Sequence, residues 1–229
     1  ITISPYVEQV VATLARETWL IPNAIRPQFF LPPTVFPRAM EAPRLINVGV
    51  ISPIKRQLEL LELFMRLRAT SEFNVTFVGK TDRHDAYSCK FVDLLHKANT
   101  LHGGFDHINS VSAENLIGLF DASDALVHFS HEESFGLIFA EALARNLPVF
   151  ASDVGAIREI SEDVPNCQIF ERNDFERLAS AIRRWIHARE YVVPRPNTPN
   201  TVVESRYSPH TVAGMHLEAY QEILRNFRQ

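Results

Sequence analysis

The chain has 229 residues, 46% of them hydrophobic, and a formal net charge of −4 at pH 7. A chain of this length and hydrophobic content can bury a substantial core, which favours one globular domain with appended segments over a disordered polypeptide. The small net charge and the lack of any run of five or six like charges argue against nucleic-acid binding, so we expect the partner to be a small molecule.

Short β-rich runs alternate with helical patterns from about residue 45 onward, which predicts an α/β fold with a parallel sheet flanked by helices. The runs expected to form strands end near Ile51, Gly79, Ser130, Ser152 and Phe170, with a weaker run near Leu101. Apolar spacings of three and four predict helices over residues 53–70, 85–99, 113–121, 134–146 and 174–189, with a short one near Ile157. A leading helix (6–16) and a closing helix (209–227) lie beyond two proline-rich segments, 34–43 and 192–201, which we interpret as connectors.

Several motifs that would assign a function directly are missing. No two of the eight glycines are separated by one residue, which excludes the dinucleotide-binding G-x-G-x-x-G pattern. Gly79, Lys80 and Thr81 lack the earlier glycine of a P-loop, and the histidines lack a zinc-protease spacing. No G-x-S-x-G hydrolase motif occurs. We therefore expect no metal and no cofactor.

The only two cysteines, Cys89 and Cys167, are far apart and have no metal-ligand spacing. We expect them to be buried, reduced thiols of a cytoplasmic protein. The sequence also lacks a run of roughly 18 apolar residues and a secretory signal pattern, which agrees with that expectation.

Residues 124–159 predict a strand, a loop, a helix and a second strand, with an anion site at the start of the helix. Ser134 is expected to cap this helix, so that the backbone N–H groups of Phe135, Gly136 and Leu137 are free to bind a ligand. The helix dipole places about half a positive charge at this end, which is suited to a diphosphate. Gly136 would allow the phosphates to approach the backbone closely.

Two glutamates flank this turn. Glu141 lies seven residues after Ser134, about 10 Å along the helix, where its carboxylate could accept hydrogen bonds from a ribose diol. Glu133 lies in the loop, where it could face a sugar. For an arbitrary pair of glutamates, two solvated charges would be the simpler interpretation.

The loop after the first strand offers positive charge. If Ser52 caps the following helix, Lys55 occupies its third position, beside the carboxyl ends of the strands where α/β sheets bind ligands. A lysine there could neutralise a phosphate group. Arg56 could add to this charge or be solvated, and a surface role for Lys55 is an equal alternative.

Taken together, these residues resemble the retaining nucleotide-sugar glycosyltransferases of family 4. The resemblance covers most of residues 18–190 and includes Asn23 in I-P-N-A-I. The matching positions in the C-terminal domain of the family are Gly49, Lys55, Glu133, Ser134, Phe135, Gly136, Leu137, Glu141, Ala142, Pro148, Gly155 and Glu159. The departures are Val50 in place of a phosphate-binding arginine, Arg56 and Ala156 in place of glycines, and Ala24 with Arg26 in place of glycine and aspartate.

The resemblance implies that the chain is the C-terminal, donor-binding half of a GT-B enzyme with a Rossmann-like sheet. Residues 1–40 would be a crossover helix and connector from an N-terminal acceptor domain, 41–190 the nucleotide-sugar-binding domain, and 191–229 a connector and return helix. Catalytic roles fall on Lys55 and Glu133. Donor-binding roles fall on Gly49, Arg56, Ile108, Ser134, Phe135, Gly136, Leu137 and Glu141, with His107 and Ile108 as candidates for contact with the base.

The implied reaction is transfer of a hexose from a UDP- or GDP-sugar with retention of configuration and without a metal, as in cell-surface polysaccharide assembly. The fragment alone would be inactive, and any membrane contact would come through the N-terminal acceptor domain. A GT-B nucleotide-sugar epimerase and a non-catalytic nucleotide-sugar-binding domain are the alternatives. Val50 favours the non-catalytic domain, because the protein would offer the phosphates less positive charge than is usual in the family.

Overall fold

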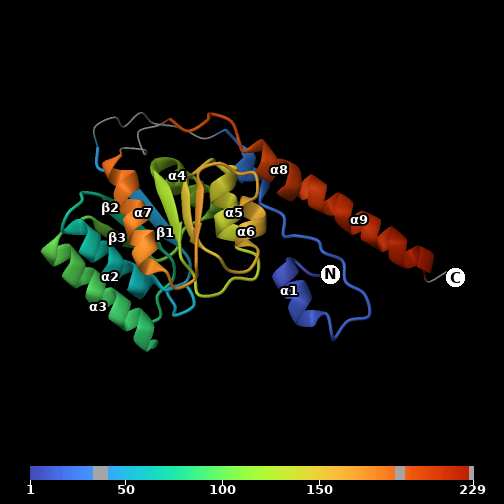
Figure 1. The fold of residues 1–229 in the computed structure, drawn as a ribbon, viewed down its shortest axis with the longest axis horizontal. Helices are drawn as coiled ribbons and strands as arrows, with labels where there is room; N and C mark the ends of the chain where they lie inside the picture. The colour runs from blue at the N-terminus through green and yellow to red at the C-terminus, as the bar shows by residue number, and fades with distance from the viewer. Residues whose placement is uncertain (33–40, 189–193, 227–229) are drawn as a thin grey trace.

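The computed structural model describes residues 1–32, 41–188 and 194–226, which are built around a six-stranded parallel sheet (Figure 1). The strands are β1 Arg44–Val48, β2 Asn74–Val78, β3 Phe105–Ile108, β4 Ala125–His128, β5 Val149–Ser152 and β6 Cys167–Phe170. Their order is β3-β2-β1-β4-β5-β6, so the direction of winding reverses between β1 and β4. This is the Rossmann order, in which ligands bind outside the carboxyl ends of the strands at the point of reversal. The predicted α/β fold class is confirmed.

Helices cover both faces of the sheet (Figure 1). Those on one face are α2 Gln57–Arg68, α3 Ala86–Leu101 and α7 Phe175–His187. Those on the other are α4 Ala113–Ala122, α5 Leu137–Ala144 and α6 Ile157–Ser161, joined by the 3-10 helix η1 Pro27–Phe30 and by α8 Thr201–Tyr207. The remaining helices, at the two ends of the described chain, are α1 Pro5–Val11 and α9 Pro209–Asn226.

The two layers form because successive strand residues point to opposite faces of the sheet. In β1, Leu45 joins the core beneath α2, α3 and α7, and Ile46 joins the core beneath α4, α5 and α6. In the first of these cores the ring of Phe77 lies 6.1 Å from that of Phe64 and 5.1 Å from that of Phe91. Burial on both faces explains why the inner strands β4 and β5 are mostly apolar, whereas the edge strands β3 and β6 are less buried and include Asp106 and Gln168.

The third strand differs from its sequence prediction. The prediction of a strand near Leu101 is wrong, because Leu101 is the last residue of α3 and β3 begins only at Phe105. The apolar spacing that carries Leu95 and Ala98 into the core keeps the chain helical up to this point. Gly103 and Gly104, with φ of 64° and 78°, then turn it into β3.

The ends of the described chain pack against the second layer and against each other. Ile25 donates its N–H to the carbonyl of Tyr207 at 2.9 Å, and both side chains belong to the core beneath α5. Ile21 packs with Val212 and Ala219 of α9, which extends away from the sheet (Figure 1).

The leading helix is shorter than the predicted 6–16, and α8 was not predicted. Residues 34–40 of the first predicted connector and residues 192–193 of the second lie outside the described residues.

The expectation of two buried thiols is wrong for Cys89, which is exposed on α3. The residues of α3 that enter the core are its neighbours Ser88, Phe91 and Leu95, so position 89 points outward. Cys167 is partly buried, and burial raises the pKa of its thiol to about 12.

A buried ion pair between Arg145 and Asp121 stabilises the helical layer that contains α4 and α5. Arg145 is 1% exposed and directs Nε and Nη2 at the two carboxylate oxygens of Asp121, at 2.6 and 2.7 Å. Its Nη1 donates to the carbonyl oxygens of Phe29 and Leu31 at 3.3 and 3.0 Å. The guanidinium therefore ties the C-terminus of α5 to α4 and to the segment that enters the fold.

Replacing Arg145 with leucine should lower the free energy of unfolding by about 3 kcal/mol or more, because a buried carboxylate loses its guanidinium. Urea denaturation measures this loss. Arg66→Leu is the matched control, because Arg66 and Glu176 form an exposed pair and the loss there should stay below about 1 kcal/mol. Equal losses in the two variants would contradict the assignment.

Candidate functional site

Two loops meet at the point where the sheet order reverses. The loop after β1 (49–56) and the loop after β4 (129–136) are joined by a hydrogen bond from the N–H of His131 to the carbonyl of Ile54, at 2.7 Å. Ser152 at the end of β5 donates its hydroxyl to the carbonyl of Ser130, also at 2.7 Å. The loops are thus held side by side at the edge of the sheet where a ligand is expected.

Lys55 and Glu133 form an ion pair across these two loops. The exposed fractions of their side chains are 26% and 11%. The same carboxylate oxygen, Oε1 of Glu133, lies 2.9 Å from Nε2 of His128 and accepts a hydrogen bond from Oγ of Ser130 at 3.2 Å. Three side chains therefore converge on one oxygen, and they bring together the two residues predicted to be catalytic.

Glu133 is held in its ionised form. Burial opposes ionisation, but the hydrogen bond and charge of His128 and the charge of Lys55 outweigh it and lower the pKa of Glu133 from its usual 4.5 to about 2. At neutral pH the carboxylate accepts hydrogen bonds and does not donate a proton. His128 and Ser130 were not predicted as site residues. Both lie at the carboxyl end of β4, which is the signal that could have identified them.

Lys55 lies in a turn, and the prediction that Ser52 caps the following helix is wrong. The carbonyl of Ser52 accepts the N–H groups of Lys55 and Arg56 at 3.0 and 2.9 Å, but Arg56 has φ of 59° and interrupts the helix, so α2 begins at Gln57. The buried carboxamide of Gln57 donates to the carbonyls of Gly49 and Val50 at 3.2 and 3.1 Å and accepts the N–H of Ser52 at 3.2 Å. A side chain, and not a regular helical turn, thus shapes this loop.

Arg56 points away from Lys55. Its guanidinium donates to the carbonyl of Arg172 at 2.7 Å and to Oδ1 of Asn173 at 3.1 Å, and it lies 4.5 Å from the centre of the Phe175 ring. The structure therefore places it against the start of α7. Val50, at the position of the arginine in the resembled family, is 61% exposed.

The helix after β4 begins three residues later than predicted, and Ser134 is not its cap. Gly136 has φ of 89° and precedes the first helical residue, Leu137, so the free N–H groups belong to residues from Leu137 onward. The carbonyl of Ser134 accepts the hydroxyl of Ser4, and the ring of Phe135 packs 5.6 Å from that of Tyr207. Phe135 is therefore a core residue whose burial sets the path of the loop.

Gly155 allows the loop after β5 to pack directly on Glu133. A Cβ atom at this position would lie 2.3 Å from the carbonyl oxygen of Glu133, and its φ of 58° is strained for other residues. The same contact brings the residues that precede α6 to the edge of the site.

Glu141 is covered by Arg26. The Glu141 side chain is 0% exposed, and its Oε1 accepts Nε and Nη2 of Arg26 at 3.0 and 2.9 Å. Its Oε2 is buried without a partner in the described part of the chain. Burial raises the pKa of this carboxyl group, and Arg26 opposes the effect. Glu141, the residue predicted to bind ribose, thus lies beneath the guanidinium of Arg26, which was not predicted to belong to the site.

The remaining predicted residues border the same edge of the sheet. Gly49 follows β1 directly and lies against the aliphatic stem of Lys55. Ile108 ends β3 and is partly buried. Nε2 of His107 lies 2.8 Å from the carbonyl of Gly79, so this histidine already has a structural partner. An open hollow of about 700 Å³ adjoins these strand ends and is lined by residues 50–53, 80–85 and 88.

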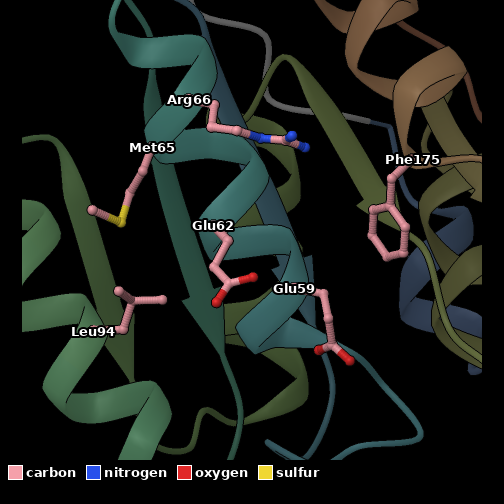
Figure 2. Close-up of a pocket in the computed structure, with 6 residues that line it drawn as sticks. All are labelled: Glu59, Glu62, Met65, Arg66, Leu94 and Phe175. Atoms are coloured by element: carbon pink, nitrogen blue, oxygen red, sulfur yellow. The ribbon is translucent and has the colours of Figure 1, made fainter.

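A second groove, of about 580 Å³, lies on the helical layer formed by α2, α3 and α7. Figure 2 shows its lining side chains, which are Glu59, Glu62, Met65, Arg66, Leu94 and Phe175. None of the residues predicted to bind a ligand lines it, and its walls are helical side chains, not the loops at the strand ends. We therefore place the candidate site at the reversal point of the sheet.

Across residues 1–32, 41–188 and 194–226, no group of three or more histidine, cysteine, aspartate or glutamate side chains is arranged to hold a metal ion. Within the same residues, no helix has both the length and the apolar character needed to cross a membrane.

Comparison with known sequences identifies relatives of this chain. The sequence model of the family described as "Glycosyl transferases group 1" matches residues 34–197. The serotype-specific mannosyltransferase WbdA of Escherichia coli is 29% identical over 146 residues, which are 63% of this chain and 17% of that protein. The D-inositol 3-phosphate glycosyltransferase of Geodermatophilus obscurus is 31% identical over 157 residues, 66% of this chain and 35% of that protein. The chain spans about a sixth to a third of the length of these two relatives.

Solved structures share the fold. The sucrose-phosphate synthase from Thermosynechococcus elongatus matches 98% of this chain and 58% of its own, with a TM-score of 0.80 and 21% identity. The Anabaena protein HepE in complex with UDP-glucose matches 98% of this chain and 63% of its own, with a TM-score of 0.75 and 16% identity. At these identities the likeness establishes the Rossmann-like fold.

Replacing Glu133 with glutamine should lower the free energy of unfolding at pH 7 by about 2 to 3 kcal/mol, because Lys55 and His128 lose their anionic partner. A carboxyl group with a lowered pKa stabilises the fold above its usual value of 4.5, and this stabilisation is lost as the pH falls through about 2. The difference between wild type and variant should therefore shrink below about pH 4.5.

Urea denaturation from pH 7 to pH 2.5 measures this difference. Glu132→Gln, at the exposed neighbouring position, is the control and should show little change at any pH. A gap between wild type and Glu133→Gln that stays constant down to pH 2.5 would show that the carboxylate is not held ionised by its neighbours.

Proposed function

Because the chain belongs to the glycosyl transferases group 1 family, we propose that it binds a nucleoside-diphosphate sugar and forms the donor half of an enzyme that transfers the sugar to an acceptor with retention of configuration. The observation that carries this proposal is the Lys55–Glu133 pair at the reversal point of a Rossmann sheet, beside the start of α5. The names of the relatives, a mannosyltransferase and an inositol phosphate glycosyltransferase, support a sugar donor.

The diphosphate of the donor would lie between Lys55 and the first turn of α5. Departure of a sugar leaves negative charge on the diphosphate, and a lysine together with the N-terminus of a helix can stabilise it without a metal. Gly136 is buried against Cδ1 of Ile157, so a phosphate oxygen would instead meet the backbone N–H groups that follow it, beginning at the exposed Leu137. Lys55 would act as the electrostatic catalyst, and neither a metal nor a cofactor is required.

Glu133 would orient the donor and Lys55. Since its pKa lies near 2, it is an anion at neutral pH, and it is unsuited to give a proton to the leaving group. A buried anion can accept hydrogen bonds from sugar hydroxyls while it holds the ammonium group of Lys55 in place. Glu141, in the second turn of α5, is the proposed acceptor for the pentose, and Ile108 at the end of β3 lies where the base would pack.

The acceptor would be bound mainly outside this chain. The chain corresponds to only part of each relative described above, and the exposed apolar side chains Leu217, Tyr220 and Leu224 lie on α9, which extends away from the sheet (Figure 1). We propose that an N-terminal acceptor domain precedes residues 1–40 and that residues 191–229 return toward it. The donor half alone would then bind nucleotide without transferring sugar.

A non-catalytic nucleotide-sugar-binding domain is the second candidate, because the exposed Val50 provides no charge for the phosphates and Arg56 is directed elsewhere. Calorimetry of the 229-residue chain with UDP, GDP and ADP tests the shared requirement that a nucleotide binds. Sugar transfer by the complete protein distinguishes the two candidates. Failure of all three nucleotides to bind would refute both.

Lys55→Ala should lower turnover of the complete enzyme by about 100-fold or more, because the charge that develops on the leaving diphosphate loses its nearest cation. Initial rates with saturating donor measure the change. Lys97→Ala, on the exposed face of α3, is the matched control and should retain normal activity. Near-normal turnover of Lys55→Ala would show that another cation neutralises the diphosphate.

Glu141→Ala should weaken binding of whichever nucleotide the wild type accepts by about tenfold or more, since hydrogen bonds to a charged acceptor contribute about 1.5 to 3 kcal/mol. Calorimetry on the 229-residue chain gives the dissociation constants. Glu176→Ala, at an exposed site on α7, should bind like the wild type. Unchanged affinity of the Glu141 variant would refute its assignment to the pentose.

A further inference from the structure

The Glu141 carboxylate cannot be reached from solvent while Arg26 lies over it. The Glu141 side chain is 0% exposed and that of Arg26 is 44% exposed, so the guanidinium forms the outer layer of the pair. Both Nε and Nη2 of Arg26 donate to Oε1 of Glu141. A pentose hydroxyl could reach this carboxylate only if the guanidinium moved.

The arrangement of the pair is incompletely satisfied. The two donors of Arg26 fall on a single oxygen, and Oε2 of Glu141 is buried without a partner within the described residues. A desolvated carboxylate oxygen without a donor is unfavourable. A vicinal diol has two hydroxyl donors and can supply one to each carboxylate oxygen. A pentose would therefore satisfy Glu141 more fully than Arg26 does.

Arg26 has a second contact besides Glu141. Its guanidinium lies 4.9 Å from the centre of the Phe29 ring, a contact that keeps the charge near the surface. Since the Arg26 side chain is already 44% exposed, a guanidinium that left Glu141 could stay over this ring and be solvated.

We propose that Arg26 is an internal competitor for the pentose site, which leaves Glu141 and turns toward solvent when the hydroxyl groups of a nucleotide take its place. The proposal rests on the proposed function, because it assumes that Glu141 accepts the pentose. Arg26 directly precedes η1, so this exchange would link occupation of the donor site to the segment that leads into the fold.

The competitor can be removed by mutation. In the 229-residue chain, Arg26→Ala should bind UDP or GDP about three- to tenfold more tightly than the wild type, which is the scale of one partly exposed ion pair. Arg66→Ala, which removes the exposed partner of Glu176, should leave the affinity unchanged. The gain should disappear in the Arg26→Ala/Glu141→Ala double variant, and it should disappear for the 2′,3′-dideoxy form of the same nucleoside diphosphate, which has no diol.

Weaker or unchanged nucleotide binding by a folded Arg26→Ala variant would overturn the proposal, because Arg26 would then contact the nucleotide or play no part. A gain that persists with the dideoxynucleotide would also overturn it. If the wild-type chain binds no nucleoside diphosphate, the proposed function itself fails. If the wild type binds and Glu141→Ala has no effect, the pentose assignment fails, and the proposed competition fails with it.

A second measurement uses the wild-type chain and does not depend on whether the alanine variant folds. The Nε–H of Arg26 donates to a buried carboxylate, so its proton resonance should exchange slowly with water, and a spectrum of Arg26→Lys identifies it by its absence. Addition of saturating UDP or GDP, whichever binds, should shift this resonance and speed its exchange. A resonance that stays in place and remains protected at saturation would overturn the proposal.

Discussion

The ion pair between Lys55 and Glu133 is the interaction on which the geometry of the candidate site depends. It joins the loops that follow β1 and β4, the two adjacent strands between which the sheet order reverses. In a sheet of this order the connections on either side of the reversal run in opposite directions, and ligands bind in the crevice between them. The contacts around the pair, from Gln57, His128 and Gly155, keep both loops in position. The site is therefore built from loop contacts on a rigid sheet.

The pair also limits the charge that the crevice can offer. Lys55 is already balanced by Glu133, Arg56 is directed at the start of α7, and Val50 is apolar. A bound diphosphate would have to share Lys55 with Glu133 and rely on the first N–H groups of α5 for the rest of its stabilisation. The low pKa of Glu133 follows from the same balance, since two cationic or potentially cationic neighbours surround one carboxylate.

Residues before and after the sheet contribute to the site as much as the sheet itself. Ser4 fixes the carbonyl of Ser134, Arg26 covers Glu141, and Tyr207 packs on Phe135. These contacts connect the loop after β4 and helix α5 to segments at both ends of the chain. A movement of those segments relative to the sheet would therefore alter the pocket through the loop after β4 and through α5.

The sequence by itself determined the α/β class, five of the six strands, the long helices and the family, because these follow from apolar periodicity and from a contiguous motif. It also located Lys55 and Glu133, whose positions after strands place them at one edge of a parallel sheet. Only the tertiary structure decided that α5 begins after Gly136, that Arg56 faces α7 and that Glu141 lies beneath Arg26. Arg26 and Glu141 are 115 positions apart, and Arg56 and Arg172 are 116 apart, so no local pattern records either contact. Such contacts arise from how the layers pack, and they determine which charges face a ligand.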